Sequence, residues 1–444
     1  MKNTKIIISI LILMLSLLIL SSCNIVIEFE NDEDLKFIEN YGGMNYSVAG
    51  IGENQNEEII IPDTYKGKPV TIIKADAFSD CHSITSVVIP DSIKTIAARA
   101  FKNCINLEKV TLPNNIEFLY EETFYGCKSL KEIEIPNSVK IIEARTFEDC
   151  IKLEKVTLPN NMEFLYEETF YGCKSLKEIE IPNSIISIGA RVFTGCDSLE
   201  YNQYDNGYYL GNVTNPYFIL AKAASKEITT ININENTKFI LERAFSHCKK
   251  LTTIEIPDNV ISIGSNAFVY CENLKEVKLS ENLKKIDSIF TNCINLTSIT
   301  IPESVKSIEW AAFRGCQSLK EIIIPNSVIS IGEEAFADCV NLTTISFEEN
   351  SQLEKIGNMA FNECINLLNI ILPKNITSIG ERAFYDCNSL TNLELSNNVK
   401  TIGKEAFTKC MKLTIYCEAK EKPTGFHINW AAYGPKVVWG GNQE

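Results

Sequence analysis

The sequence predicts an α/β solenoid of about 14–15 stacked coils of 23 residues, with a parallel β-sheet on one face and short turns or helices on the other. Fourteen cysteines, from Cys81 to Cys410, each follow a phenylalanine by three positions. Ten of the thirteen intervals between successive cysteines are 23 residues long. Length alone would suggest about three compact domains. The fixed period instead indicates one elongated domain, because repeats of this size stack as coils of a continuous array.

The three irregular intervals show where the array departs from its period. They are 22, 25 and 52 residues long, and the longest runs from Cys196 to Cys248. Two periods and six extra residues fit within it. Residues 199–221 lack the phenylalanine and cysteine positions and contain Gly207, Gly211 and the pair Asn215-Pro216. Turn residues of this kind predict a hairpin-like, degenerate coil within the stack.

The coil from Cys127 to Cys150 shows what each repeat is expected to form. Ile133 and Ile135 alternate with Glu134, as in a short strand with two apolar residues inward and one acid outward. Pro136 then ends the strand, because proline donates no hydrogen bond to a sheet. Val139 and Ile142 point inward on the return path, and the segment around Phe147 has room for only a turn or two of helix.

This pattern closely resembles the BspA-like leucine-rich repeat family, whose coils read roughly Leu-x-x-Ile-x-Ile-Pro-x-Ser-Val-x-x-Ile-Gly-x-x-Ala-Phe-x-x-Cys. Stretches of Ile-Gly-x-x-Ala-Phe occur at 263–268, 331–336, 356–361, 379–384 and 402–407. The resemblance implies a right-handed superhelix, with an array over residues 56–416 and a closing cap over residues 417–444. It also implies a role at the cell surface, because members of the family include adhesins of host-associated microbes.

The amino terminus has the order of an export signal. Lys2 and Lys5 precede an apolar run over residues 6–20, which is short for a membrane span, and Leu20-Ser-Ser-Cys23 follows. That ending resembles a bacterial lipobox, which implies that residues 1–22 are removed as a lipoprotein signal peptide and that Cys23 carries the lipid. Residues 23–55 would form the tether and the N-terminal cap. An ordinary signal peptide with an incidental cysteine is the alternative.

The repeated cysteines admit two interpretations. Strands about 4.8 Å apart would bring neighbouring thiols within the range of a disulfide, and an exported protein meets oxidising conditions. Equivalent side chains of stacked coils point the same way, however, and buried cysteine packs as a small apolar residue. We therefore expect free, buried thiols. A metal site is not expected, because no C-x-x-C pair occurs and six residues separate the closest pair, Cys410 and Cys417.

Catalysis and nucleic-acid binding are not expected either. His82, His247 and His427 lie far apart in the sequence, and no hydrolase or phosphate-binding motif is present. His82 and His247 each adjoin a cysteine, but a neighbour in sequence does not supply the geometry of a catalytic dyad. A formal net charge of -15 disfavours binding to phosphate backbones. The prediction is a protein without enzymatic activity, cofactor or bound metal.

Stacking would align the outward strand side chains into a strip about 70 Å long, shallow and without a deep pocket. This row is the candidate ligand-binding strand face, charged in the N-terminal half and more apolar near its end. Any one of its residues could equally be an ordinary solvent-facing strand residue. The candidates are Lys109, Thr111, Glu132, Glu134, Lys155, Thr157, Glu178, Glu180, Glu255, Lys278, Thr300, Ile323 and Ile371.

Together these features predict an exported, surface-exposed bacterial protein anchored to the cell membrane through its lipid. Its expected partners are protein or glycoprotein ligands, of a host matrix or of another cell surface, bound through the solenoid as in an adhesin. The alternative is a cell-envelope scaffold that contacts the producer's own surface components.

Overall fold

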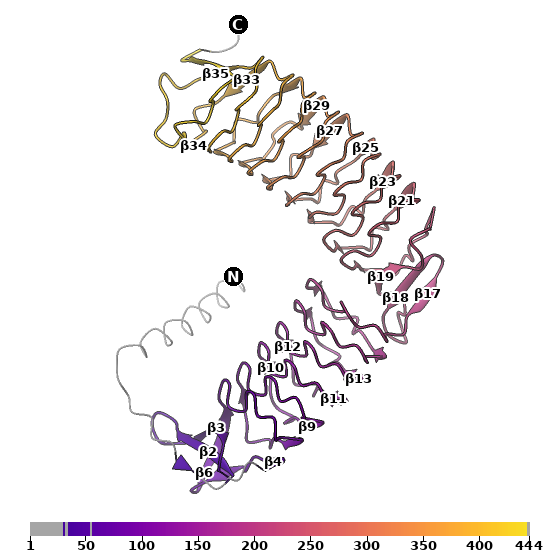
Figure 1. The fold of residues 1–444 in the computed structure, drawn as a ribbon, viewed down its shortest axis with the longest axis vertical. Helices are drawn as coiled ribbons and strands as arrows, with labels where there is room; N and C mark the ends of the chain where they lie inside the picture. Colours follow the sequence, from indigo (N-terminus) through magenta and orange to yellow (C-terminus); the bar gives the residue numbers. More distant parts are fainter. Residues whose placement is uncertain (1–29, 32–33, 54–55, 442–444) are drawn as a thin grey trace.

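A computed structural model describes residues 30–31, 34–53 and 56–441. These residues form a curved stack of coils, in which the first and last coils lie at the two ends of an arc (Figure 1). The predicted signal peptide and Cys23 lie outside the described residues. No helix among the residues that the structure covers is long and apolar enough to cross a membrane.

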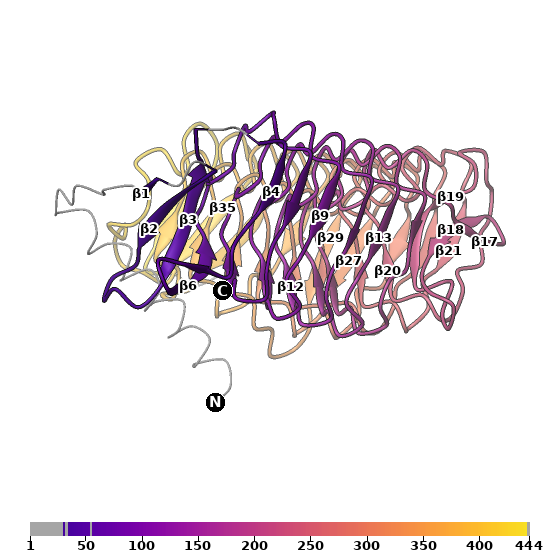
Figure 2. The same ribbon diagram turned by 90° about the horizontal axis from the view of Figure 1, so that it is seen from below.

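Each regular coil contributes two short strands, and successive coils pair them in parallel. In one coil these strands are β11 (Glu132–Glu134) and β12 (Ile141–Ile142). β11 pairs in parallel with the strand one period later, with Ile133 opposite Val156. Ile133 and Ile142 are buried, as their apolar side chains require. Figure 2 shows the strands of successive coils lying side by side.

The first strands of the coils form what we call the outer ladder, a series of short parallel sheets that follow one another along the stack. The strand bounds are β4 (Glu58–Ile60), β7 (Ser86–Val88), β9 (Lys109–Thr111), β11 (Glu132–Glu134), β13 (Lys155–Thr157), β15 (Glu178–Ile179), β21 (Thr253–Glu255), β23 (Glu276–Lys278), β25 (Ser298–Ile299), β27 (Glu321–Ile324), β29 (Thr344–Phe347), β31 (Asn369–Ile370), β33 (Asn392–Leu395), β35 (Thr414–Cys417) and β36 (Lys436–Trp439).

The second strands form what we call the inner ladder. Its strands are β8 (Thr95–Ile96), β10 (Phe118–Leu119), β12 (Ile141–Ile142), β14 (Phe164–Leu165), β16 (Ser187–Ile188), β20 (Phe239–Ile240), β22 (Ser262–Ile263), β24 (Lys285–Ile286), β26 (Ser307–Ile308), β28 (Ser330–Ile331), β30 (Lys355–Ile356), β32 (Ser378–Ile379) and β34 (Thr401–Ile402).

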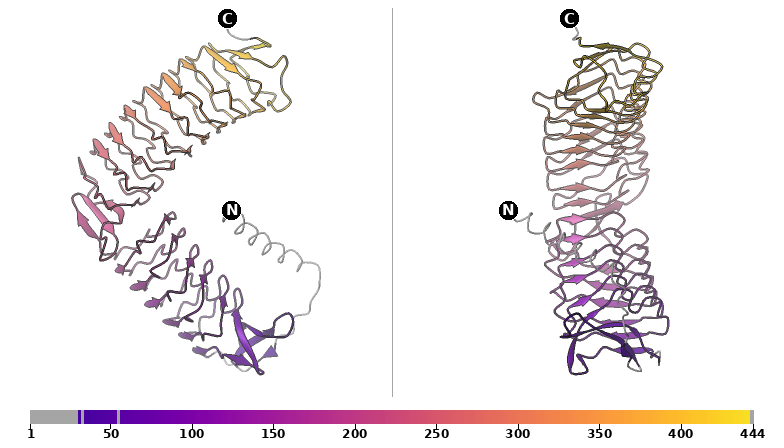
Figure 3. Two further views of the ribbon diagram at one scale, coloured as in Figure 1. Left: turned by 180° about the vertical axis from the view of Figure 1, so that it is seen from behind. Right: turned by 90° about the vertical axis from the view of Figure 1, so that its left-hand side faces the viewer.

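The two ladders lie on opposite sides of the arc. In Figure 1, β9, β11, β13, β21, β23, β25, β27 and β29 follow the outer, convex side, whereas β10, β12 and β34 lie along the inner side. Figure 3 shows the strands arranged one above another along the length of the molecule. The candidate strand face, which belongs to the outer ladder, therefore faces outward from the curve.

Both ends of the stack are closed by non-repeating strands. At the N-terminal end, β1 (Glu30–Asn31), β2 (Leu35–Glu39), β3 (Tyr46–Ile51), β5 (Thr64–Tyr65) and β6 (Lys68–Ile73) share a mixed sheet, and β6 pairs onward with β8. At the other end, Phe426 and Trp430 are buried beneath the last coils. The predicted cap boundary at residue 417 falls at the end of β35, which belongs to the paired outer ladder.

The stack is interrupted once, at the degenerate coil. β17 (Asn202–Tyr204) and β18 (Gly207–Leu210) form an antiparallel hairpin, and β18 pairs antiparallel with β19 (Ile219–Ala223). β19 returns to the parallel register by pairing with β20. This small antiparallel sheet lies at the bend of the arc on its outer side (Figure 1).

The predicted solenoid of parallel stacked coils is confirmed, but the second face of the described residues holds turns and no helices, so the α/β description is not confirmed. The segment that precedes each cysteine is made of turns, with two residues per coil in the left-handed region. In one coil these are Arg145 at φ 58° and Asp149 at φ 57°, on either side of Phe147. A helix cannot pass through such residues. The N–H of Phe147 instead donates to the carbonyl of Thr169 in the next coil.

We call these segments the Phe–Cys turns, and they build the interior of the stack. Within each of the two runs of coils, successive phenylalanine rings stack with centroids 4.9–5.9 Å apart and interplanar angles of 3–21°. Trp430 closes the second run edge-on, 5.8 Å from Phe407. Offset aromatic contacts add to the large apolar area that each ring buries. Stacking therefore stabilises each step within the two runs.

Candidate ligand-binding face

The structure places all thirteen predicted face residues on or immediately after strands of the outer ladder, and all are exposed. They alternate with buried residues, as Glu132 and Glu134 do with Ile133. The pleat produces this arrangement, because successive side chains of a strand point to opposite sides. The face is therefore an outward row of side chains in two stretches, one on each side of the degenerate coil.

Its N-terminal part is a ladder of alternating charges. Parallel pairing puts Lys155 between Glu132 and Glu178 on the neighbouring strands. Opposite charges at facing positions of a sheet attract each other, although exposed pairs contribute little to stability. The edge of this region also carries ion pairs one period apart, such as Lys177 with Glu154 at 2.9 Å. Most charge here is balanced within the protein.

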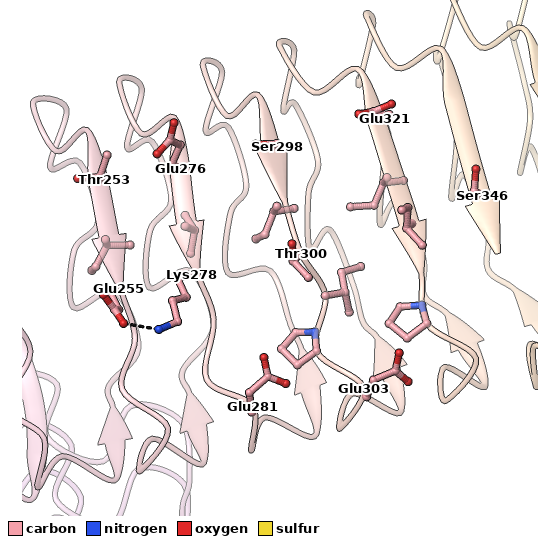
Figure 4. A pocket seen from close by; sticks show the side chains of 18 of the residues that line it. Thr253, Glu255, Glu276, Lys278, Glu281, Ser298, Thr300, Glu303, Glu321 and Ser346 are labelled. Carbon is pink, nitrogen blue, oxygen red and sulfur yellow. Dashed lines mark hydrogen bonds and ion pairs between the residues drawn. The ribbon is translucent and has the colours of Figure 1, made fainter. Parts of the chain in front are cut away.

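The C-terminal part contains a groove of about 1020 Å³ over the outer-ladder strands from β21 to β29. Figure 4 shows Glu276, Ser298 and Thr300 on adjacent strands, and Glu281 and Glu303 in the loops that follow. Among the predicted residues it brings together Glu255, Lys278, Thr300 and Ile323. Ile371 lies in a neighbouring depression of about 830 Å³. The open groove has the shape for an extended ligand.

The groove is acidic with an apolar patch. The residues that line it include six glutamates and one lysine, and Lys278 forms an ion pair with Glu255. A hydrogen bond with the neighbouring Glu348 carboxyl raises the pKa of Glu303 above its ordinary value. Ile323 keeps 60% of its surface exposed and Ile371 keeps 87%. Exposed isoleucines next to carboxylates suit a ligand with both basic and apolar groups.

Three loop glutamates of the groove are not among the predicted face residues. Glu281 and Glu303 lie in the turns after β23 and β25, and Glu348 follows β29. The prediction considered only residues within the strands, whereas the groove also uses residues beyond the strand ends. The proline position could have identified one of them, because Glu303 directly follows Pro302.

The fifteen described cysteines are free, as expected. All but Cys81 are buried, and most thiols donate to the carbonyl of a phenylalanine in the preceding coil, as Cys293 does to Phe268 at 3.1 Å. Burial raises the pKa of these thiols, to about 12 for Cys271 and Cys339. They remain protonated and unreactive at neutral pH. Among the described residues, no group of three potential ligands could hold a metal ion.

His247 and His427 both contact neighbouring residues of the protein. His247 Nδ1 lies 2.8 Å from Ser246 Oγ, and its ring packs 4.9 Å from that of Tyr270. The neighbouring Cys248 thiol is directed elsewhere, towards the carbonyl of Ser225 at 3.8 Å. His427 Nδ1 accepts a hydrogen bond from the backbone of Asn429. His247 and Cys248 are therefore not arranged as a Cys–His dyad.

Comparison with known families identifies the repeat. The model of the BspA type leucine-rich repeat region matches residues 56–207, 223–289 and 287–414. The chain belongs to this family. The matched segments leave out residues 208–222, which overlap the antiparallel sheet. No curated protein sequence matches this BspA-type chain.

Solved structures of similar proteins include other bacterial leucine-rich repeat proteins. A leucine-rich cell surface protein from Faecalibacterium prausnitzii is 29% identical, with 73% of this chain and 96% of that one covered and a TM-score of 0.41. A leucine-rich repeat protein from Bacteroides ovatus is 23% identical over 87% of this chain and 99% of its own, with a TM-score of 0.35. The pneumococcal vaccine antigen PcpA is 19% identical over 93% and 99%, with a TM-score of 0.42.

Proposed function

We propose that this BspA-type protein is a lipid-anchored surface protein that binds protein or glycoprotein ligands through the strand face. The observation that carries this proposal is the groove over β21 to β29, which joins exposed isoleucine to carboxylates that are mostly without a basic partner. A shallow groove of this kind suits an extended macromolecular ligand better than a small molecule. The partner it fits carries basic and apolar side chains.

The anchor follows from the amino-terminal segment. Cleavage before Cys23 would leave a thioether-linked lipid, followed by an acidic tether over residues 28–34. The solenoid would then extend from the membrane with its face accessible. Replacement of Cys23 by Ala tests this step, because fatty-acid labelling and retention in the membrane fraction should both be lost. A membrane-bound, labelled variant would contradict the anchor without affecting the binding proposal.

Binding itself is tested with the mature chain as bait against matrix proteins, host cells and the producer's own envelope. Saturable capture of foreign proteins or glycoproteins supports the proposed function. Crosslinking on intact cells separates it from the envelope scaffold, since crosslinks to self components alone would favour the scaffold. A point variant of the groove, Ile323→Arg, should weaken capture. Ile329→Arg in the same coil is the matched control, because Ile329 is also exposed but lies just before β28 of the inner ladder.

A further inference from the structure

The interruption of the stack leaves main-chain donors without partners. In thirteen of the fourteen Phe–Cys turns, the phenylalanine N–H donates to a carbonyl of the segment that follows in the stack. Phe193 is the exception. Its N–H and those of Arg191 and Gly195 have no acceptor among the described residues, whereas Phe170 donates to Val192 and Gly172 to Thr194. Phe193 is only 8% exposed, so an unpaired donor is costly there, whereas Arg191 and Gly195 are exposed and water can reach their N–H groups.

The antiparallel sheet explains why the N–H groups of the Phe193 turn lack acceptors. The next phenylalanine position is Phe245, in the coil beyond β17 to β19, and no ring stacks on the far side of Phe193 in the described structure. Between the two turns lies a crevice of about 370 Å³, lined by both. We call it the break crevice. The residues that line it are Gly189, Arg191, Val192, Phe193, Thr194, Gly195, Cys196, Asp197, Tyr201, Ala221, Lys222, Lys226, Leu241, Glu242 and Arg243.

The break crevice is basic in an acidic protein. It contains Arg191, Lys222, Lys226 and Arg243 against two acids, Asp197 and Glu242, which gives four positive and two negative groups. The chain as a whole carries a formal charge of -15. Arg191 pairs with Glu168 at 2.8 Å and Arg243 with Glu242 at 3.5 Å. Lys222, which lies 4.3 Å from the ring centroid of Tyr201, and Lys226 supply the remaining positive charge. The local field therefore favours an anionic partner.

The spacing of the three unpaired N–H groups indicates which kind of molecule could bind there. In an intact coil, the N–H groups of Arg145, Phe147 and Asp149 donate to carbonyls of Glu167, Thr169 and Tyr171, three alternate residues of one segment. The same three positions are open at Arg191, Phe193 and Gly195. Their complement is a peptide main chain that presents carbonyls at alternate residues, rather than one compact anion. Added segments of this kind gain affinity from main-chain hydrogen bonds.

We propose that the break crevice binds an extended, acidic segment of another protein, whose main chain adds along the open side of the Phe193 turn. Its carbonyls accept from Arg191, Phe193 and Gly195. Its carboxylates face Lys222 and Lys226, because Arg191 and Arg243 already pair with glutamates of this chain. This site is separate from the groove over β21 to β29, and its chemistry is the opposite, because the groove is acidic. Neither proposal depends on the other.

The test uses the mature chain and a peptide of alternating Glu and Val, with a Lys-Val peptide as the control ligand. The Glu-Val peptide should bind saturably and the Lys-Val peptide should not. Lys226→Glu combined with Arg243→Glu should weaken binding by about tenfold or more. The matched control changes Lys128 and Lys152 to Glu; both are exposed residues that follow the cysteine of an intact coil. It should shift affinity by less than about twofold.

Amide hydrogen exchange distinguishes main-chain pairing from simple charge attraction. In the free protein, amides 191, 193 and 195 should exchange about tenfold or more faster than the equivalent amides 145, 147 and 149, and the Glu-Val peptide should slow them to a similar degree. Binding without slowed exchange would overturn the proposal in favour of a charge patch. Equal binding of both peptides, no binding at all, or protection of these amides in the free protein would overturn it as well.

Discussion

The Phe–Cys turns and the outer ladder belong to the same coils, but they differ in how far their residues are repeated from one coil to the next. At the turns the same phenylalanine and cysteine recur, and nearly every one is buried. On the strand face the residues change from coil to coil, from the Glu-Lys ladder near β11 to the isoleucine and carboxylates near β27. The comparison indicates that the turns carry the stability of the stack, whereas the strand face is open to specialise for a ligand.

Removal of a stacked ring should have the largest effect on stability. Phe290→Ala leaves a cavity between Phe268 and Phe313, and we expect a loss of about 3–5 kcal/mol in the free energy of unfolding. Phe193→Ala should cost less, because Phe193 stacks on Phe170 alone. Urea unfolding followed by circular dichroism measures both. Equal losses at the two positions would contradict the role of stacking between coils.

High pH should destabilise the turns through the buried thiols. Burial raises the pKa of cysteines such as Cys196, Cys271 and Cys339 to about 12, so the folded chain keeps protons that the unfolded chain releases. Their contribution to stability is present below about pH 9 and is lost as the pH rises further. The urea midpoint should therefore fall as the pH rises from about 9 towards 12. Cys271→Ala should reduce that fall, and an unchanged slope would contradict the assignment.

Thiol accessibility should differ within the turns themselves. Cys81 is partly exposed, whereas the other described cysteines are buried. Burial and the nearby Asp80 carboxylate raise the pKa of Cys81, but access still makes it the first to react. Iodoacetamide labelling of the native mature chain, read by peptide mass spectrometry, should modify Cys81 before Cys104 or Cys127. Labelling of a buried turn cysteine at the same rate would show that the turns open readily.

Substitutions on the strand face should have the smallest effect on stability. Thr300 is exposed in the groove, so its side chain does not contribute to the packing of the core. Thr300→Arg should change the free energy of unfolding by no more than about 0.5 kcal/mol. Thr401→Arg, at an exposed position of β34 in the inner ladder, is the control. A large loss at Thr300 would mean that the face shares the structural role of the turns.

The repeat made much of this fold predictable from the sequence. The period of 23 residues determined the register, and the alternation around Glu134 identified the inward and outward side chains. The turns were harder to predict, because left-handed residues such as Arg145 and Asp149 are not glycines and give no local signal. The loop glutamates of the groove and the open donors at Phe193 depend on which coils lie next to one another. That information is absent from any single repeat.

The central claim is that the strand face, and not the inner ladder of the same coils, binds the proposed protein or glycoprotein ligand. The most direct measurement compares the affinity of captured ligand for the unchanged mature chain, for Ile323→Arg and for Ile329→Arg. Ile323 lies in the groove on β27, and Ile329 lies in the same coil on the inner side. We predict a loss of about tenfold or more for Ile323→Arg and less than about twofold for Ile329→Arg. Equal affinities for all three proteins would contradict the claim.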